Sequence, residues 1–178
     1  MRLVVRTLQT AKLVLRQLER EDAASLHPVF ADPETMQYWW RAPHASLTET
    51  EEAVAINADG SDTIACWAIT KDSRVALGWI NLRIKRDGVA DVGYILSRKC
   101  WGQGLGREAL AAVVSHGFGP MGLHRIAADT DPDNHGSIAV LRSLGFVQEG
   151  HLRGEWKTHI GVRDSLIFGL LAGEWDTP

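Results

Sequence analysis

The feature that most constrains this chain is a glycine-rich segment between an apolar run and an amphipathic run, with glycines at Gly102, Gly104 and Gly106. The apolar run over 92–96 has the residue types of a β-strand. From 107 to 118, apolar residues recur at four-residue spacing, which predicts a helix. Glycines leave the backbone amides in front of this helix uncovered, and such amides bind anions. The stretch from Asp91 to His116 therefore predicts a strand, an anion-binding turn and a helix, and it suggests a phosphate-bearing ligand.

The composition predicts one soluble globular domain over residues 1–178. Hydrophobic residues make up 45% and charged residues 23% of the chain, as in ordinary globular proteins. A net charge of −3 gives no support for a nucleic-acid partner. With only Cys66 and Cys100, the chain lacks a disulfide framework, so we expect a cytoplasmic location. No run predicts a membrane span or a membrane partner, and exposed tryptophans would allow a homodimer.

The order of the predicted elements indicates a mixed sheet. Periodicity and turn residues predict strands over 13–18, 63–70, 74–84, 89–97, 124–130, from 146 and over 164–171. They predict helices over 22–30, 35–40, from Ser46 or Thr48 to Asn57, over 107–118 and over 137–144, and a loop or hairpin over 156–161. Short polar links join the central strands, as in an antiparallel meander, and the later helix permits a parallel crossover. We expect an α/β fold with a mixed, largely antiparallel sheet flanked by helices.

A dinucleotide site is one alternative interpretation of the glycines. Residues 104–109 fit the pattern G-x-G-x-x-A, and Asp129 follows at about the 20-residue spacing of a ribose-binding acid. However, a doubly wound nucleotide-binding fold places this motif first, whereas here antiparallel strands precede it. An NAD-dependent oxidoreductase stays open at this point as a function from another class.

Four ordered motifs resemble one known family. They are Leu13-Val14-Leu15-Arg16, Val92-Gly93-Tyr94-Ile95-Leu96, Trp101-Gly102-Gln103-Gly104-Leu105-Gly106, and Asn134-His135-Gly136-Ser137 followed by Leu144-Gly145-Phe146. Together they resemble the RimJ/RimL-like branch of the GNAT acetyltransferases, from about residue 13 to 175. The resemblance implies a GNAT-type fold and an N-acetyltransferase that uses acetyl-CoA as co-substrate.

The resemblance also implies a cofactor-binding set. Backbone groups of Ile95 and Leu96 would pair with the pantetheine arm, and Asn134 and Ser137 would lie along it. Asn134 is, by residue type alone, equally suited to cap the following helix. The loop amides that would hold the pyrophosphate belong to Gly102, Gln103, Gly104, Leu105, Gly106 and Arg107. The family's usual Arg or Gln at the start of this loop is Trp101 here, so we expect no phosphate contact from that side chain.

Three catalytic roles follow for direct attack of a neutral amine on the thioester. The N–H near Leu96 would stabilise the oxyanion, and Ser137 would assist the thiolate leaving group, since this branch often places serine there. Glu155 is the nearest match to an acidic position that serves as base. His135, His151 and His159 have more suitable unperturbed pKa values, and water is a further alternative.

The acceptor is a primary amine whose identity the sequence leaves open. A protein N-terminal α-amine is the first candidate, and a small-molecule amine such as an antibiotic or a polyamine is the alternative. A non-catalytic CoA-binding sensor with the same fold is also retained. The seven histidines include no H-x-x-x-H pair, so no zinc site is expected.

Overall fold

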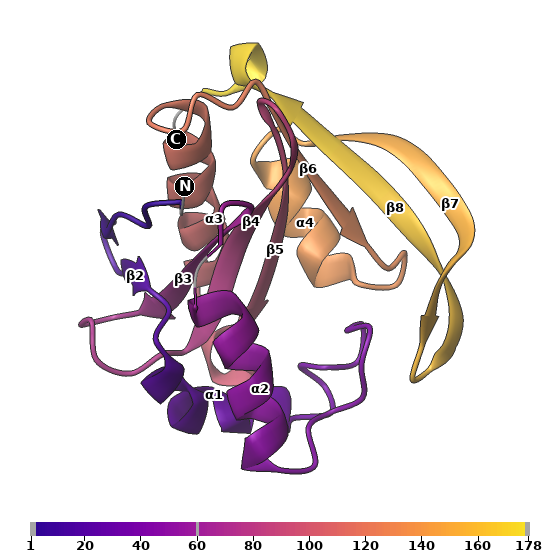
Figure 1. Ribbon diagram of the computed structural model, residues 1–178. Coiled ribbons are helices and arrows are strands. Elements are labelled where there is room, and N and C mark those ends of the chain that lie inside the picture. Colours follow the sequence, from indigo (N-terminus) through magenta and orange to yellow (C-terminus); the bar gives the residue numbers. More distant parts are fainter. Residues whose placement is uncertain (1–2, 60, 177–178) are drawn as a thin grey trace.

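In the computed structural model, which describes residues 3–59 and 61–176, one eight-stranded sheet is formed with the order β1-β2-β3-β4-β5-β6-β8-β7 (Figure 1). Its strands are β1 (Leu8–Gln9), β2 (Val14–Gln17), β3 (Ile64–Thr70), β4 (Gly78–Arg86), β5 (Val89–Leu96), β6 (Arg125–Thr130), β7 (Val147–Thr158) and β8 (Gly161–Leu171). Within the described residues, β5 and β6 form a parallel pair and the other neighbouring strands are antiparallel. The expected mixed, largely antiparallel sheet is confirmed.

Helices cover both faces of this sheet. They are α1 (Ala23–Phe30), α2 (Leu47–Ala58), α3 (Leu105–Phe118) and α4 (His135–Ser143), with 3-10 turns η1 (Arg20–Asp22), η2 (Arg98–Cys100) and η3 (Ala172–Glu174). One core cluster joins α3 and α4 to the sheet through residues such as Leu110 and Leu141, and a second joins α1 and α2 through Phe30 and Val54. Of the helices in the described part of the chain, none combines the length and apolar character needed to cross a membrane.

In the first half of the chain, capping residues and short polar links predict most of the helices and strands. Ser46 accepts a hydrogen bond from the Glu49 N–H at 3.4 Å, and Glu49 in turn accepts one from the Ala45 N–H at 3.0 Å. These bonds begin α2 where the capping signal predicts it. The meander β3-β4-β5 also forms as expected, because its polar links are too short for a crossover.

Two segments differ from the prediction. Residues 35–40 form turns rather than a helix. The Asp32 carboxylate accepts hydrogen bonds from the backbone and hydroxyl of Thr35, which holds a turn, and Trp39 packs edge-on against Phe30 at 6.3 Å.

The C-terminal hairpin is longer than predicted, with β7 running to Thr158 and β8 beginning at Gly161. Its register shifts between Gln148 and Gly150 and again between Leu152 and Trp156. Each shift breaks the two-residue alternation by which a strand is recognised in a sequence.

Candidate active site

The parallel strands β5 and β6 separate part way along their length. Their described register ends at Asp91 opposite Ala127, whereas β5 continues for five more residues to Leu96. The backbones of β5 and β6 therefore diverge beside the second half of β5 (Figure 1), and the region between the two diverging strands is called the opening below.

The hydrogen-bond alternation decides which backbone groups of β5 face this opening. The Ser97 N–H donates to the Leu77 carbonyl at 2.7 Å, and β4 and β5 keep one register from there to Ala90. In an antiparallel pair the residues turn their backbone groups alternately toward and away from the partner. Ile95 therefore faces Trp79 on β4, while Tyr94 and Leu96 present theirs to the opening. The predicted contact at Leu96 suits this geometry, and Tyr94 rather than Ile95 is the second strand residue that faces the opening.

The glycine-rich turn lies at the end of β5 and has the expected backbone freedom. Gly102 and Gly104 have φ values of 71° and 75°, in the left-handed region that favours glycine. A methyl group added at either residue would meet no atom within 4 Å. Helix α3 begins at Leu105, two residues before the prediction, and Leu105 is buried while Arg107 is exposed. The turn thus combines uncovered amides, open space and a helix N-terminus, which suits a pyrophosphate.

Two side chains tie this turn to its neighbours. The Trp101 indole N–H donates to the Leu96 carbonyl at 2.9 Å, so the strand end and the turn are fixed relative to each other. Gln103 donates its side-chain amide back to the Lys99 carbonyl at 2.8 Å, which holds its side chain against η2. Trp101 was not expected to contact phosphate, and the structure gives its side chain this supporting role instead.

We therefore expect Trp101→Phe to weaken acetyl-CoA binding about 2- to 10-fold, the effect of losing one hydrogen bond that orders a binding loop. Calorimetric titration measures it. Trp40→Phe is the matched control, because Trp40 is similarly exposed and its ring packs against the Arg41 guanidinium. An unchanged acetyl-CoA affinity of Trp101→Phe would show that the hydrogen bond from Trp101 to Leu96 does not contribute to binding.

Asn134 and Ser137 meet at the N-terminus of α4. The Ser137 N–H donates to Asn134 Oδ1 at 3.1 Å, so Asn134 does cap the helix, and its Nδ2 group is left to donate elsewhere. Ser137 Oγ lies 2.9 Å from the Tyr94 hydroxyl on β5. The preceding turn is held by Arg163 on β8, which binds Asp131 at 2.7 Å. The first turn of α4 is thereby fixed beside β5.

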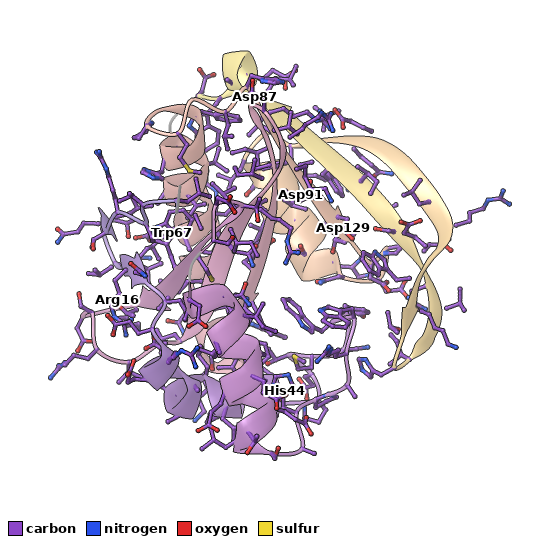
Figure 2. The ribbon with its side chains drawn as sticks, viewed as in Figure 1. Arg16, His44, Trp67, Asp87, Asp91 and Asp129 are labelled. Atoms are coloured by element: carbon purple, nitrogen blue, oxygen red, sulfur yellow. The ribbon has the colours of Figure 1, made fainter. Side chains whose placement is uncertain are left out.

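The opposite face of the sheet carries an acidic hollow of about 180 Å³ at the point where β5 and β6 separate. Its charged and aromatic lining comes from Lys85, Asp91, Asp129, Glu155 and Trp156. The Trp156 indole donates to Asp129 Oδ2 at 2.9 Å, and Lys85 lies 3.1 Å from Asp91. Figure 2 shows Asp91 and Asp129 beside β5 and β6, well away from Asp87 at the β4–β5 turn. Three carboxylates against one ammonium favour a cationic ligand.

The four candidate bases, Glu155, His135, His151 and His159, lie in different surroundings. Glu155 is exposed and lies in the hollow. His151 is bound to Asp164 at 2.8 Å on the same hairpin, while His135 and His159 are exposed. Glu155 alone of these four lines the hollow with Asp91 and Asp129.

The sequence interpretation missed one positioning residue of the glycine-rich turn. Glu108, in the first turn of α3, accepts hydrogen bonds from the Thr10 hydroxyl at 2.5 Å and from the Lys12 N–H at 2.7 Å. It therefore anchors the N-terminal segment against the helix. An acidic residue in the first turn of a helix is a recognisable sequence signal, so Glu108 could have been singled out. Its partners could not have been predicted, because they lie 96 and 98 residues away in the chain.

In residues 3–59 and 61–176 no group of three or more His, Cys, Asp or Glu side chains is arranged to hold a metal. Both cysteines are free and buried.

Comparisons with known proteins agree with this geometry. The family model for the acetyltransferase (GNAT) domain matches residues 12–147. The N-acetyltransferase p20 of Bacillus licheniformis is 33% identical over 174 residues, which cover 95% of this chain and 98% of that protein. The spermidine N(1)-acetyltransferase of Escherichia coli is 28% identical over 154 residues, which cover 80% and 76%.

Among solved structures, RimJ of Mycobacterium smegmatis in complex with CoA-disulfide superposes with a TM-score of 0.80. It is 24% identical in sequence, and the match covers 96% of this chain and 88% of RimJ. At this identity the likeness shows the fold alone, so the RimJ/RimL-like branch stays a prediction.

Proposed function

Because this chain belongs to the GNAT family of acetyltransferases and is an N-acetyltransferase that uses acetyl-CoA, we propose that its acceptor is a small primary amine carrying more than one positive charge. The observation that carries this proposal is the acidic hollow where β5 and β6 separate. A second cationic group on the acceptor would be stabilised by the carboxylates there. The similarity to spermidine N(1)-acetyltransferases supports a polyamine as the first compound to test.

On the donor side, we assign the amides from Gly102 to Arg107 to the pyrophosphate and the backbone groups of Tyr94 to the pantetheine arm. Leu96 would meet the thioester end of that arm through its N–H, since its carbonyl already accepts from Trp101. Asn134 contributes its Nδ2 group to the same arm. Acetyl-CoA, when bound, supplies the thioester that the amine attacks directly. The open space around Gly102 and Gly104 supports the fit.

At the reacting end, the Leu96 N–H faces the opening and would donate to the developing oxyanion. Ser137 would donate to the departing sulfur. An amine with the usual lysine pKa of about 10.4 is almost wholly protonated at pH 7, so it must lose a proton before attack. Glu155 in the hollow, alone or through water, is our proposed acceptor of that proton.

The dinucleotide alternative does not suit the fold. The glycine-rich turn follows an antiparallel meander, and Asp129 is bonded to Trp156 in the hollow on the face opposite α3. Calorimetry should therefore show binding of acetyl-CoA and none of NADH. NADH binding that Asp129→Ala abolishes would overturn the proposal.

An acceptor panel separates the remaining possibilities by acetyl-CoA-dependent thiol release. The panel contains polyamines, monoamines, aminoglycosides, lysine side-chain peptides and peptides with free α-amines. We expect polyamines to give the highest kcat/KM. Preference for α-amine peptides would favour a protein N-terminus instead, and acetyl-CoA binding without turnover on any amine would indicate a CoA-binding sensor.

Neutralising the hollow should weaken polyamine recognition. Asp129→Asn keeps an oxygen for the Trp156 N–H but removes the charge, and we expect it to raise KM for a polyamine about 2- to 5-fold, as for an exposed charge pair. A monoamine should be affected less, and added salt should reduce the difference. Asp87→Asn removes another exposed charge, at the β4–β5 turn, and serves as the control. Equal effects of the two substitutions would contradict recognition in the hollow.

A further inference from the structure

A tyrosine hydroxyl and a serine hydroxyl meet between β5 and α4. Tyr94 Oη lies 2.9 Å from Ser137 Oγ, although the two residues are 43 positions apart in the chain. The Tyr94 ring packs against the core cluster that contains α3 and α4, so the phenol is directed to the first turn of α4. The Ser137 hydroxyl therefore shares a hydrogen bond with Tyr94.

The backbone at Ser137 is already fixed from two sides. Asn134 Oδ1 accepts the Ser137 N–H, and Arg163 holds the preceding turn through Asp131 and Asp133. The remaining freedom at Ser137 is the rotation of its side chain and of its single hydroxyl proton. The hydrogen bond with Tyr94 restricts both.

The direction of this bond decides what Ser137 can do. If the phenol donates, the serine proton stays available for another acceptor. If the serine donates, its only proton is used. Burial raises the pKa of the Tyr94 phenol, while the Ser137 contact opposes that rise, so the phenol keeps its proton near neutral pH. A protonated phenol can donate to Ser137.

We propose that Tyr94 is a positioning residue that donates its hydrogen bond to Ser137 and thereby directs the serine proton toward the sulfur of the departing coenzyme. This inference rests on the proposed function of Ser137. Tyr94 itself does not lose its proton, since a phenol is a weaker acid than a thiol even before burial. A hydroxyl that accepts a hydrogen bond is also a stronger donor, so the pair stabilises a thiolate better than Ser137 alone.

The decisive measurement needs no acceptor amine. A donor aimed at sulfur favours the thiolate of CoA, so the ratio of CoA affinity to desulfo-CoA affinity should rise with pH toward the ordinary thiol pKa of about 8.5. The effects of His135, and of other groups that act on both ligands alike, cancel in this ratio. We expect Tyr94→Phe, which retains the ring, to flatten the rise as Ser137→Ala does.

A double-mutant cycle on kcat tests whether Tyr94 acts through Ser137. We expect Tyr94→Phe to lower kcat about 3- to 10-fold in the wild-type background, as for loss of one orienting hydrogen bond. In the Ser137→Ala background it should have no further effect. Tyr38→Phe is the matched control, since Tyr38 is the other tyrosine of the chain.

The outcomes separate this inference from the proposed function. A wrong acceptor class changes the amine panel but leaves the CoA ratio and its response to Tyr94→Phe intact. If Ser137→Ala flattens the pH dependence and Tyr94→Phe does not, the positioning role is wrong. If Tyr94→Phe lowers kcat equally in both backgrounds, Tyr94 acts independently of Ser137, and the inference is likewise overturned.

Discussion

Gly104→Val is expected to weaken acetyl-CoA binding by at least about tenfold, a loss of about 1.4 kcal/mol or more. Gly104 is the residue before α3 and has a φ of 75°. A Cβ atom added there meets no atom within 4 Å apart from its chain neighbours, so the first carbon of a side chain does not clash with the fold. The same open space is the one that the pyrophosphate would fill, and a valine would exclude it. Calorimetric titration with acetyl-CoA gives the affinity directly.

Backbone strain must be separated from this steric effect. Any side chain in the left-handed region costs about 1–2 kcal/mol. Gly122 supplies the matched control, because it has a φ of 66° and equally open surroundings but follows the far end of α3. Gly104→Val and Gly122→Val should lower the free energy of unfolding similarly, while only the former lowers affinity. If either valine variant folds poorly, Gly104→Ala and Gly122→Ala repeat the comparison. Equal acetyl-CoA affinities for the Gly104 and Gly122 variants would contradict a phosphate site at Gly104.

The parts of the fold that could be predicted depend on near neighbours in the chain. Short polar links determine the meander, Ser46 and Glu49 mark the start of α2, and the glycines mark a turn with left-handed residues. These signals operate within a few residues. They are therefore readable without the tertiary structure.

The rest of the site depends on contacts that no local pattern contains. Tyr94 and Ser137 lie on different elements, and the hollow combines residues from β4, β5, β6, β7 and β8. The sequence predicts the strand but not which of its residues turn their backbone groups toward β4. Since these groups alternate, a shift of one residue exchanges the residues that face β4 for those that face away, which is why Ile95 was expected at the cofactor. The alternation is set by the pairing of β5 with β4, which involves residues far from the glycines.

A buried ion pair at the other end of the sheet should matter most for stability. Arg16 on β2 binds both oxygens of Asp22, at 2.8 and 2.7 Å, and it also donates to the carbonyls of Gln17, Ser73 and Arg74. Asp22 is 5% exposed. The hydrogen bond to Asp22 raises the pKa of Arg16, so the pair stays charged. This single guanidinium joins β2, η1 and the β3–β4 turn.

We expect Arg16→Met to lower the free energy of unfolding by about 3–5 kcal/mol, because it leaves a buried carboxylate without its partner. Arg16→Lys should recover little, since an ammonium cannot reproduce the forked contact. Adding Asp22→Leu to Arg16→Met should restore much of the stability, because the unpaired charge is then removed as well. Urea denaturation gives all three values.

The control is a second arginine that pairs at the surface. Arg20 binds Asp59, but the two side chains are 64% and 46% exposed, so Arg20→Met should change the unfolding midpoint little. Arg16 lies away from Asp91 and Asp129 in Figure 2, so the folded fraction of Arg16→Met should keep the wild-type KM for a polyamine. Similar unfolding midpoints for Arg16→Met and Arg20→Met would contradict the prediction that the buried Asp22 carboxylate destabilises the fold when it loses Arg16.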